Sequence, residues 1–119
     1  MPVMATTHRI DLDDVERDFL LTGLLQWGGV VAMTDDLAKA TGFSGAEDYY
    51  SRVVDLVNAL DDPGLSATDW RRALAVAEVA FSSEILGLGH QWEDFSHYDP
   101  DDTYQAMRRL QWRVLGLSY

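Results

Sequence analysis

A run of sixteen residues without a formal charge, residues 19–34 (FLLTGLLQWGGVVAMT), constrains the fold more than any other part of the chain. Charged residues bracket it on both sides. A helix that crosses a membrane needs about 20 mostly apolar residues, so this run is too short for one. A helix that is apolar around most of its circumference is typically surrounded by neighbouring helices. The sequence therefore predicts a buried helix at the centre of a small core, and no membrane span.

The ends of this first helix are predicted from its flanking residues. Asp11 can cap the start, because an Asp side chain accepts a hydrogen bond from the free N–H groups of a first turn. The helix is expected to end within residues 30–33. Gly28 and Gly29 weaken a helix by about 1 kcal/mol each relative to Ala, so they predict either a kink or an earlier end.

Caps and apolar periodicity predict further helices. A short one, residues 37–41, is closed by Gly42. Capping-box spacings, Ser44 with Glu47 and Ser66 with Asp69, open two longer helices; the second is expected to run over residues 67–86. The last helix follows the Asp99–Pro100 pair, a cap and a proline at the first position. The predicted inward stripes are Tyr49, Val53, Leu56 and Leu60; Trp70, Leu74, Ala77, Phe81 and Ile85; and Thr103, Met107, Leu110 and Val114.

These elements predict an all-α fold: a single-domain compact helical bundle of four main helices plus one short helix. The domain is expected to span residues 1–119, with residues 1–10 as a flexible tail. Glu84 falls on the apolar side of the 67–86 helix and is expected to have an Arg partner. The arginines of the last helix, Arg108, Arg109 and Arg113, are expected on its other faces, either solvated or paired with the acidic first helix.

Charge and composition limit the classes of function. Twenty Asp and Glu against nine Lys and Arg give a formal net charge of −11. Direct binding to nucleic acid is disfavoured, because that affinity comes from Lys and Arg on phosphates, whereas a basic protein partner would be attracted. The absence of cysteine removes disulfides and thiol chemistry and suits a reducing compartment. With polar, acidic N-terminal residues that do not predict a secretion signal, the expected location is cytoplasmic.

The segment of residues 90–102 is the predicted functional region, since it combines aromatic and acidic side chains between two well-marked helix boundaries. Exposed rings supply buried area in an interface, and carboxylates pair with Arg or Lys of a partner. The alternative is that Trp92 and Phe95 pack back as a lid on the core. The predicted partner-binding residues are Trp92, Glu93, Asp94, Phe95, Tyr98, Asp99, Asp101 and Asp102.

The same segment permits a metal hypothesis. If it were helical, His90, Glu93 and His97 would lie on one side, and two imidazoles with one carboxylate can bind iron or zinc. The spacing matches no metalloenzyme signature. The chain also lacks phosphate-binding glycine loops and a nucleophile elbow. The sequence therefore favours a binding protein without a cofactor over an enzyme, and a small metal-dependent helical enzyme is the alternative.

In composition, a small acidic helical chain without cysteine resembles immunity proteins, antitoxins and nucleic-acid mimics that block basic enzymes, although no motif is shared. The leading hypothesis is therefore an inhibitor that neutralises a basic protein, such as a toxin or nuclease. A third hypothesis is a homo-oligomeric structural protein, with a homodimer that buries surplus apolar surface of the first helix.

Overall fold

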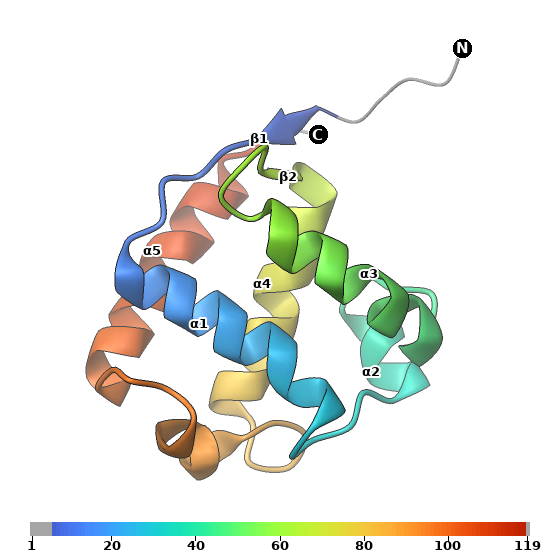
Figure 1. Cartoon of the computed structure of the whole chain (residues 1–119), viewed down its shortest axis with the longest axis vertical. Helices are drawn as coiled ribbons and strands as arrows, with labels where there is room; N and C mark the ends of the chain where they lie inside the picture. The colour runs from blue at the N-terminus through green and yellow to red at the C-terminus, as the bar shows by residue number, and fades with distance from the viewer. Residues whose placement is uncertain (1–5, 119) are drawn as a thin grey trace.

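Five α-helices and two short 3-10 helices make up most of residues 6–118, the part of the chain that this computed structural model describes (Figure 1). The predicted all-α bundle of four longer helices and one short helix is confirmed. Within residues 6–118, no helix is both long and apolar enough to cross a membrane. The elements are β1 (Thr7–His8), α1 (Asp14–Leu25), η1 (Gln26–Gly28), α2 (Asp35–Ala40), α3 (Ala46–Ala59), β2 (Leu65–Ser66), α4 (Ala67–Ser82), η2 (Gly89–Asp94) and α5 (Pro100–Leu115).

The two helices α1 and α4 cross at the centre of the bundle, and α3 and α5 pack beside them (Figure 1). The crossing depends on Gly23 of α1: a Cβ atom at this position would lie 2.5 Å from Cβ and 2.6 Å from Cα of Ala77 in α4. Phe19, Leu20 and Leu24 of α1 are fully buried around this point. The apolar surface of α1 is thus largely covered by the chain itself, with Leu25 as its exposed exception.

Helix α1 begins and ends differently from the prediction. Asp13, not Asp11, is its cap, in a reciprocal capping box with Glu16. It ends at Leu25 rather than within residues 30–33. The 3-10 turn that follows ends at Gly28, in agreement with the earlier end that Gly28 and Gly29 predicted as an alternative. Side-chain N–H and O–H groups donate to backbone carbonyls that would accept backbone N–H groups in a longer helix. Trp27 donates its indole N–H to the carbonyl of Gly23 at 2.8 Å. The hydroxyls of Tyr49 and Tyr50 donate to the carbonyls of Leu24 and Trp27.

Helix α4 also ends early, at Ser82 instead of Leu86. The chain turns back over the last turn, where the N–H of Leu88 donates to the carbonyl of Ala80 at 2.8 Å. The turn requires glycine at position 87, because a Cβ there would lie 2.2 Å from the carbonyl oxygen of Val79. Ile85, which was predicted to face inward, is consequently 90% exposed.

Residues 6–10 were predicted to belong to a flexible tail, but in the structure they contact the rest of the fold. Residues 1–5 of the predicted tail lie outside the described part of the chain. Strand β1 pairs antiparallel with β2, Thr7 opposite Ser66. Trp70 of α4 donates its indole N–H to the carbonyl of His8 at 2.8 Å, and Ile10 is buried. Periodicity in sequence does not reveal these contacts, because they join residues about 60 positions apart.

The predicted stripes of α3 and α5 are confirmed, since each residue that was assigned to either stripe is buried. Thr34 and Ser66 cap α2 and α4 through their hydroxyls. The cap of α3 is Gly45 rather than Ser44, and a carboxylate oxygen of Asp35 accepts the N–H of Ala46 at 2.9 Å.

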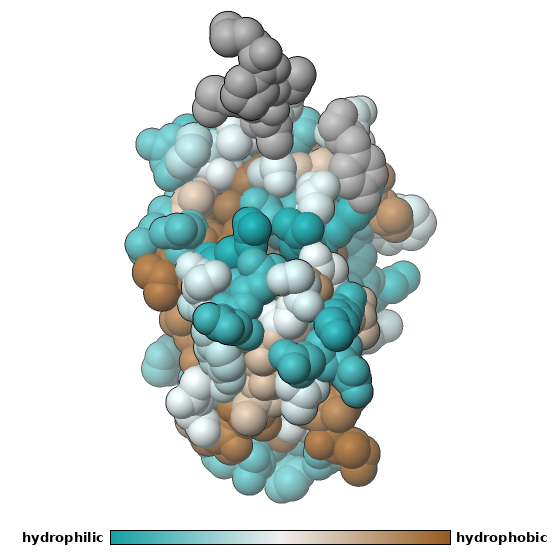
Figure 2. Space-filling view, turned by 90° about the vertical axis from the view of Figure 1, so that its right-hand side faces the viewer, coloured by the Kyte–Doolittle hydropathy of each residue, from teal (hydrophilic) through white to brown (hydrophobic). Residues whose placement is uncertain are grey.

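Figure 2, which views the right-hand side of Figure 1, shows hydrophilic residues across the centre of that face and hydrophobic ones mostly towards its edges.

A buried carboxylate joins α1 to α5. Glu16 is 2% exposed, and its Oε1 accepts the N–H of Asp13 at 2.9 Å. Its other oxygen, Oε2, lies 3.5 Å from Nε of Arg109 and forms an ion pair with Arg113. Arg109 also binds Asp13 at 3.0 Å. Pairing with the acidic first helix, one of the two predicted alternatives for these arginines, is therefore correct for Arg109 and Arg113.

Gly23→Ala is expected to destabilise the fold by about 2 kcal/mol. A Cβ only 2.5 Å from Ala77 places the cost of overpacking at the upper end of the usual range of about 1–3 kcal/mol, and the better helix propensity of Ala offsets about 1 kcal/mol. The free energy of unfolding in urea measures the change. Gly28→Ala is the matched control, because a Cβ at position 28 would have no other group within 4 Å. Equal stabilities of the two variants would contradict a close helix crossing at Gly23.

Glu16→Gln is expected to lower the free energy of unfolding by about 2 kcal/mol, the range of hydrogen bonds to charged groups. The amide keeps the shape of the side chain but cannot neutralise Arg109 and Arg113. Glu47→Gln, at an exposed position of α3, should change stability by less than about 0.5 kcal/mol. A Glu16→Gln protein as stable as the Glu47→Gln protein would show that the ion pairs of Glu16 do not stabilise the fold.

Candidate functional site

The predicted functional segment, residues 90–102, lies at the bottom of Figure 1, between the end of α4 and the start of α5. Most of its first half forms η2, a 3-10 helix that ends at Asp94. Its second half leads into α5, where a carboxylate oxygen of Asp99 accepts the N–H of Asp101 at 3.0 Å and Pro100 takes the first helical position. The predicted start of α5 is confirmed.

The aromatic residues of the segment point mostly to the core. Trp92 is 1% exposed, and its ring centroid lies 5.8 Å from that of Phe19 and 5.1 Å from that of Phe81. Phe95 is partly buried and packs against the same core, while Tyr98 is half-buried. The lid alternative is therefore correct for Trp92. Trp92 is therefore not on the surface that a partner can touch. Burial of its ring in the core is favourable, because it removes apolar surface from water.

The carboxylates of the segment face solvent. Five of them are exposed, and none forms an ion pair with a cation of residues 6–118. Helix α1 adds a sixth, because Ser96 donates its hydroxyl to Asp18 at 2.6 Å. Sequence reasoning missed Asp18, since the contact joins positions 78 apart. The acidic surface, as we name it, consists of Asp18, Glu93, Asp94, Asp99, Asp101 and Asp102.

The three metal candidates do not form a site. The helix that would align them ends at Asp94, before His97. Throughout residues 6–118, no three His, Asp or Glu side chains are grouped so that they could hold a metal ion. Instead, Nδ1 of His90 lies 2.8 Å from Oε2 of Glu84, and Oε1 of Glu84 accepts the N–H of His90 at 2.6 Å. The expected Arg partner of Glu84 is thus wrong, because Glu84 lies beyond the end of α4.

Mutual attraction shifts the ionisation of this pair. The hydrogen bond to the Glu84 carboxylate, and then its charge, raise the pKa of His90 above the ordinary value of 6.5. The hydrogen bonds from the His90 ring and backbone N–H lower the pKa of Glu84 below the ordinary value of 4.5. Both side chains are more than half exposed, so solvent screens the interaction and its effect on stability is small. The pair links the turn after α4 to the start of η2.

The exposed tryptophan of the chain is on α5, not in the predicted segment. Trp27, Trp70 and Trp92 are buried, whereas Trp112 is 70% exposed. The periodicity of α5 indicates that Trp112 is exposed, because this residue falls outside the inward stripe that ends at Val114.

The acidic surface offers charge and hydrogen-bond acceptors, which suit recognition of Lys and Arg on another molecule. Comparison of the chain with models of known protein families, with curated proteins and with solved structures gave no match in any of the three. The function must therefore be argued from the surfaces of this molecule.

The pKa of His90, measured by NMR titration of its ring protons, is expected to exceed 6.5 in the native protein and to fall in Glu84→Gln. Because the folded-state pKa of His90 is raised, its stabilising contribution is complete below its unfolded pKa and disappears as pH rises through the folded one. The contribution of Glu84, whose pKa is lowered, disappears as pH falls through its folded pKa. An unchanged His90 titration in Glu84→Gln would refute the pair.

Proposed function

We propose that this protein binds a basic protein partner through its acidic surface. One observation supports the proposal most directly: five exposed carboxylates within ten residues of chain have no cationic partner in residues 6–118. The full set, with Asp18 from α1, is the acidic surface defined above. Such a concentration of one charge raises the local potential, attracts cations and speeds the approach of a basic partner.

Several acidic residues outside the acidic surface form ion pairs within the fold. Within residues 6–118, six acidic residues pair with arginines. Three of the pairs each lie within a single helix, and the others join different parts of the fold. None of these six belongs to the acidic surface. The charges of the surface are therefore free for a partner, whose Lys and Arg side chains would relieve their mutual repulsion. The six paired acids are Asp13, Asp14, Glu16, Asp48, Asp61 and Asp69.

Half-buried rings give this surface an apolar component. Along the chain, Phe95 and Tyr98 lie between the acids of η2 and those at the start of α5. Aromatic side chains that are part of the interface contribute more to affinity than charges at its rim, which mainly set the association rate. We therefore assign the contact role that was predicted for Trp92 to Phe95 and Tyr98.

The finer proposal is that the protein acts as an inhibitor of the immunity or antitoxin type. A basic enzyme that acts on nucleic acid exposes a positive surface for its phosphates, and an acidic surface can cover it. Compositional resemblance to such inhibitors supports this version, and the toxin or nuclease remains to be identified by capture.

Capture from the lysate of the native host at low and high salt tests the proposal. We expect the tagged protein to recover a basic protein that high salt releases. Glu93→Lys/Asp94→Lys should slow association with the captured partner about tenfold or more, since electrostatic steering changes association rates by about 10–1,000-fold. Phe95→Ala should mainly speed dissociation.

The matched control is Glu47→Lys/Asp55→Lys, which changes the net charge equally at exposed positions of α3. It should retain most of the association rate. If both double variants slow association equally, the net charge and not the acidic surface attracts the partner. If neither variant affects binding at any salt concentration, the proposed site is wrong.

A further inference from the structure

Two large apolar side chains stand exposed on α5, on the side of the helix away from its buried stripe. Trp112 is 70% exposed and Leu115 is 68% exposed. They are three positions apart, so they lie next to each other on the helix surface. Single exposed apolar residues are ordinary, whereas a continuous exposed apolar patch is typical of an interaction site.

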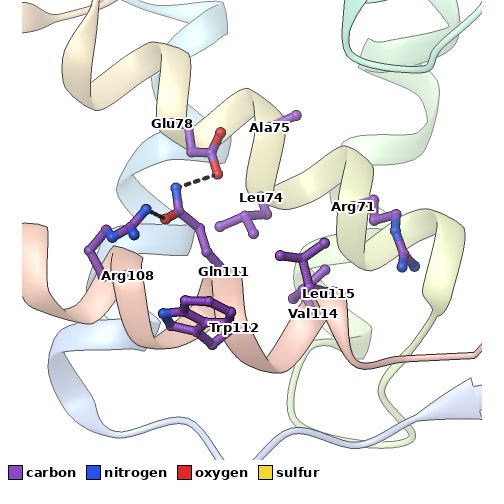
Figure 3. A pocket seen from close by; sticks show the side chains of 9 residues that line it. All are labelled: Arg71, Leu74, Ala75, Glu78, Arg108, Gln111, Trp112, Val114 and Leu115. Carbon is purple, nitrogen blue, oxygen red and sulfur yellow. Dashed lines mark hydrogen bonds between the residues drawn. The ribbon is translucent and has the colours of Figure 1, made fainter.

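The hollow is a groove of about 500 Å³ between α4 and α5 (Figure 3). Leu74 and Ala75 line it from α4, and Trp112, Val114 and Leu115 line it from α5. Its volume falls within the range of about 300–1,000 Å³ that is typical of ligand sites. A groove between two packed helices fits the side-chain ridge of a third helix.

The groove also carries charged and polar side chains. Arg71 and Arg108 lie at its two ends in Figure 3, and Glu78 lies across from Gln111, whose amide donates to it at 2.9 Å. Arg108 thus places a positive group beside the apolar side chains of the groove, on a chain with a formal net charge of −11.

Arg108 is the group that a partner carboxylate can reach. Its neighbours Arg109 and Arg113 form ion pairs with residues of α1 or its cap. Arg108 is exposed and forms no ion pair with any acid of residues 6–118, although the chain has twenty acids. It donates instead to the side-chain oxygen of Gln111. An arginine fork binds a carboxylate more strongly than an amide oxygen.

We propose that the α4–α5 groove is a second docking site, which binds an amphipathic helix with acidic residues along the edge of its apolar face. Leu and Phe side chains of that helix would fill the groove against Trp112 and Leu115, and a carboxylate would bind Arg108. This site is separate from the acidic surface and takes a partner of opposite charge.

Trp112 provides a specific readout, because the other three tryptophans are buried. The probes are three synthetic helical peptides of about 18 residues, five turns, with one apolar Leu/Phe face and a neutral polar face. They differ only along the edge of the apolar face, which carries Glu, Gln or Lys. Titration in 0.15 M salt reduces attraction or repulsion by the whole chain, because the screening length is then about 8 Å.

The Glu peptide is expected to shift the Trp112 emission to shorter wavelength and to protect it from acrylamide. It should bind at least tenfold more tightly than the Lys peptide. With fluorescein-labelled peptides, Arg108→Glu should reverse this order and Leu115→Ser should weaken every peptide. Tyr104→Ala, exposed on α5 outside the groove, should leave binding of the Glu peptide unchanged. Circular dichroism confirms that each variant is folded.

Several outcomes would overturn the proposal. Equal or tighter binding of the Lys peptide at Trp112 would refute the acidic partner, and no binding of any peptide would refute the helix site. Shielding of Trp112 that grows with protein concentration, together with dimers in sedimentation, would identify a second copy of this chain as the occupant. A Trp112 shift with dodecanoate but with no peptide would identify a small apolar anion.

Discussion

The close crossing of α1 and α4 at Gly23 is the contact on which the rest of the bundle depends. Gly23 contributes no side chain there, and a Cβ at this position would lie 2.5 Å from the Cβ of Ala77. This approach lets Phe19 of α1 reach Phe81 of α4 and Trp92 of η2 in one aromatic cluster. Helix α5 then packs on both helices, and the buried carboxylate of Glu16 joins its end to the start of α1. Both candidate binding surfaces lie on elements that this crossing holds in place.

Sequence predicted the parts of the fold that local chemistry determines. The stripes predicted for α3 and α5 are buried along their whole length, so periodicity identified the faces that these two helices turn to the core. It failed at the ends of α1 and α4, where apolar residues continue past the last helical turn. Hydrogen bonds from Tyr49 and Tyr50 stop α1, and the return of the chain at Gly87 stops α4. These are tertiary contacts, and an apolar run of sequence does not distinguish a longer helix from a loop packed on the core.

The same distinction applies to the surfaces. Exposed acids of residues 90–102 were predictable, because unpaired charges are rarely buried. Burial of Trp92 was not, since it depends on Phe19 and Phe81 of two other helices. Trp112 was identifiable from the stripe of α5, yet the groove beside it was not, because α4 forms its other wall. A pattern on one helix can reveal an exposed ring but cannot show whether a neighbouring helix creates a hollow next to it.

Helix α5 presents acids at its start and arginines near its end, an arrangement that the helix dipole alone favours. The dipole and capping account for Asp99, Asp101 and Asp102 without any partner. They do not account for Glu93 and Asp94, which belong to another helix, nor for Trp112 and Leu115, whose exposure leaves apolar area in water. Arg109 and Arg113 stabilise the fold through Glu16, whereas Arg108 does not share that carboxylate. Glu93, Asp94, Trp112 and Leu115, whose positions fold stability does not explain, thus belong to the two proposed binding surfaces.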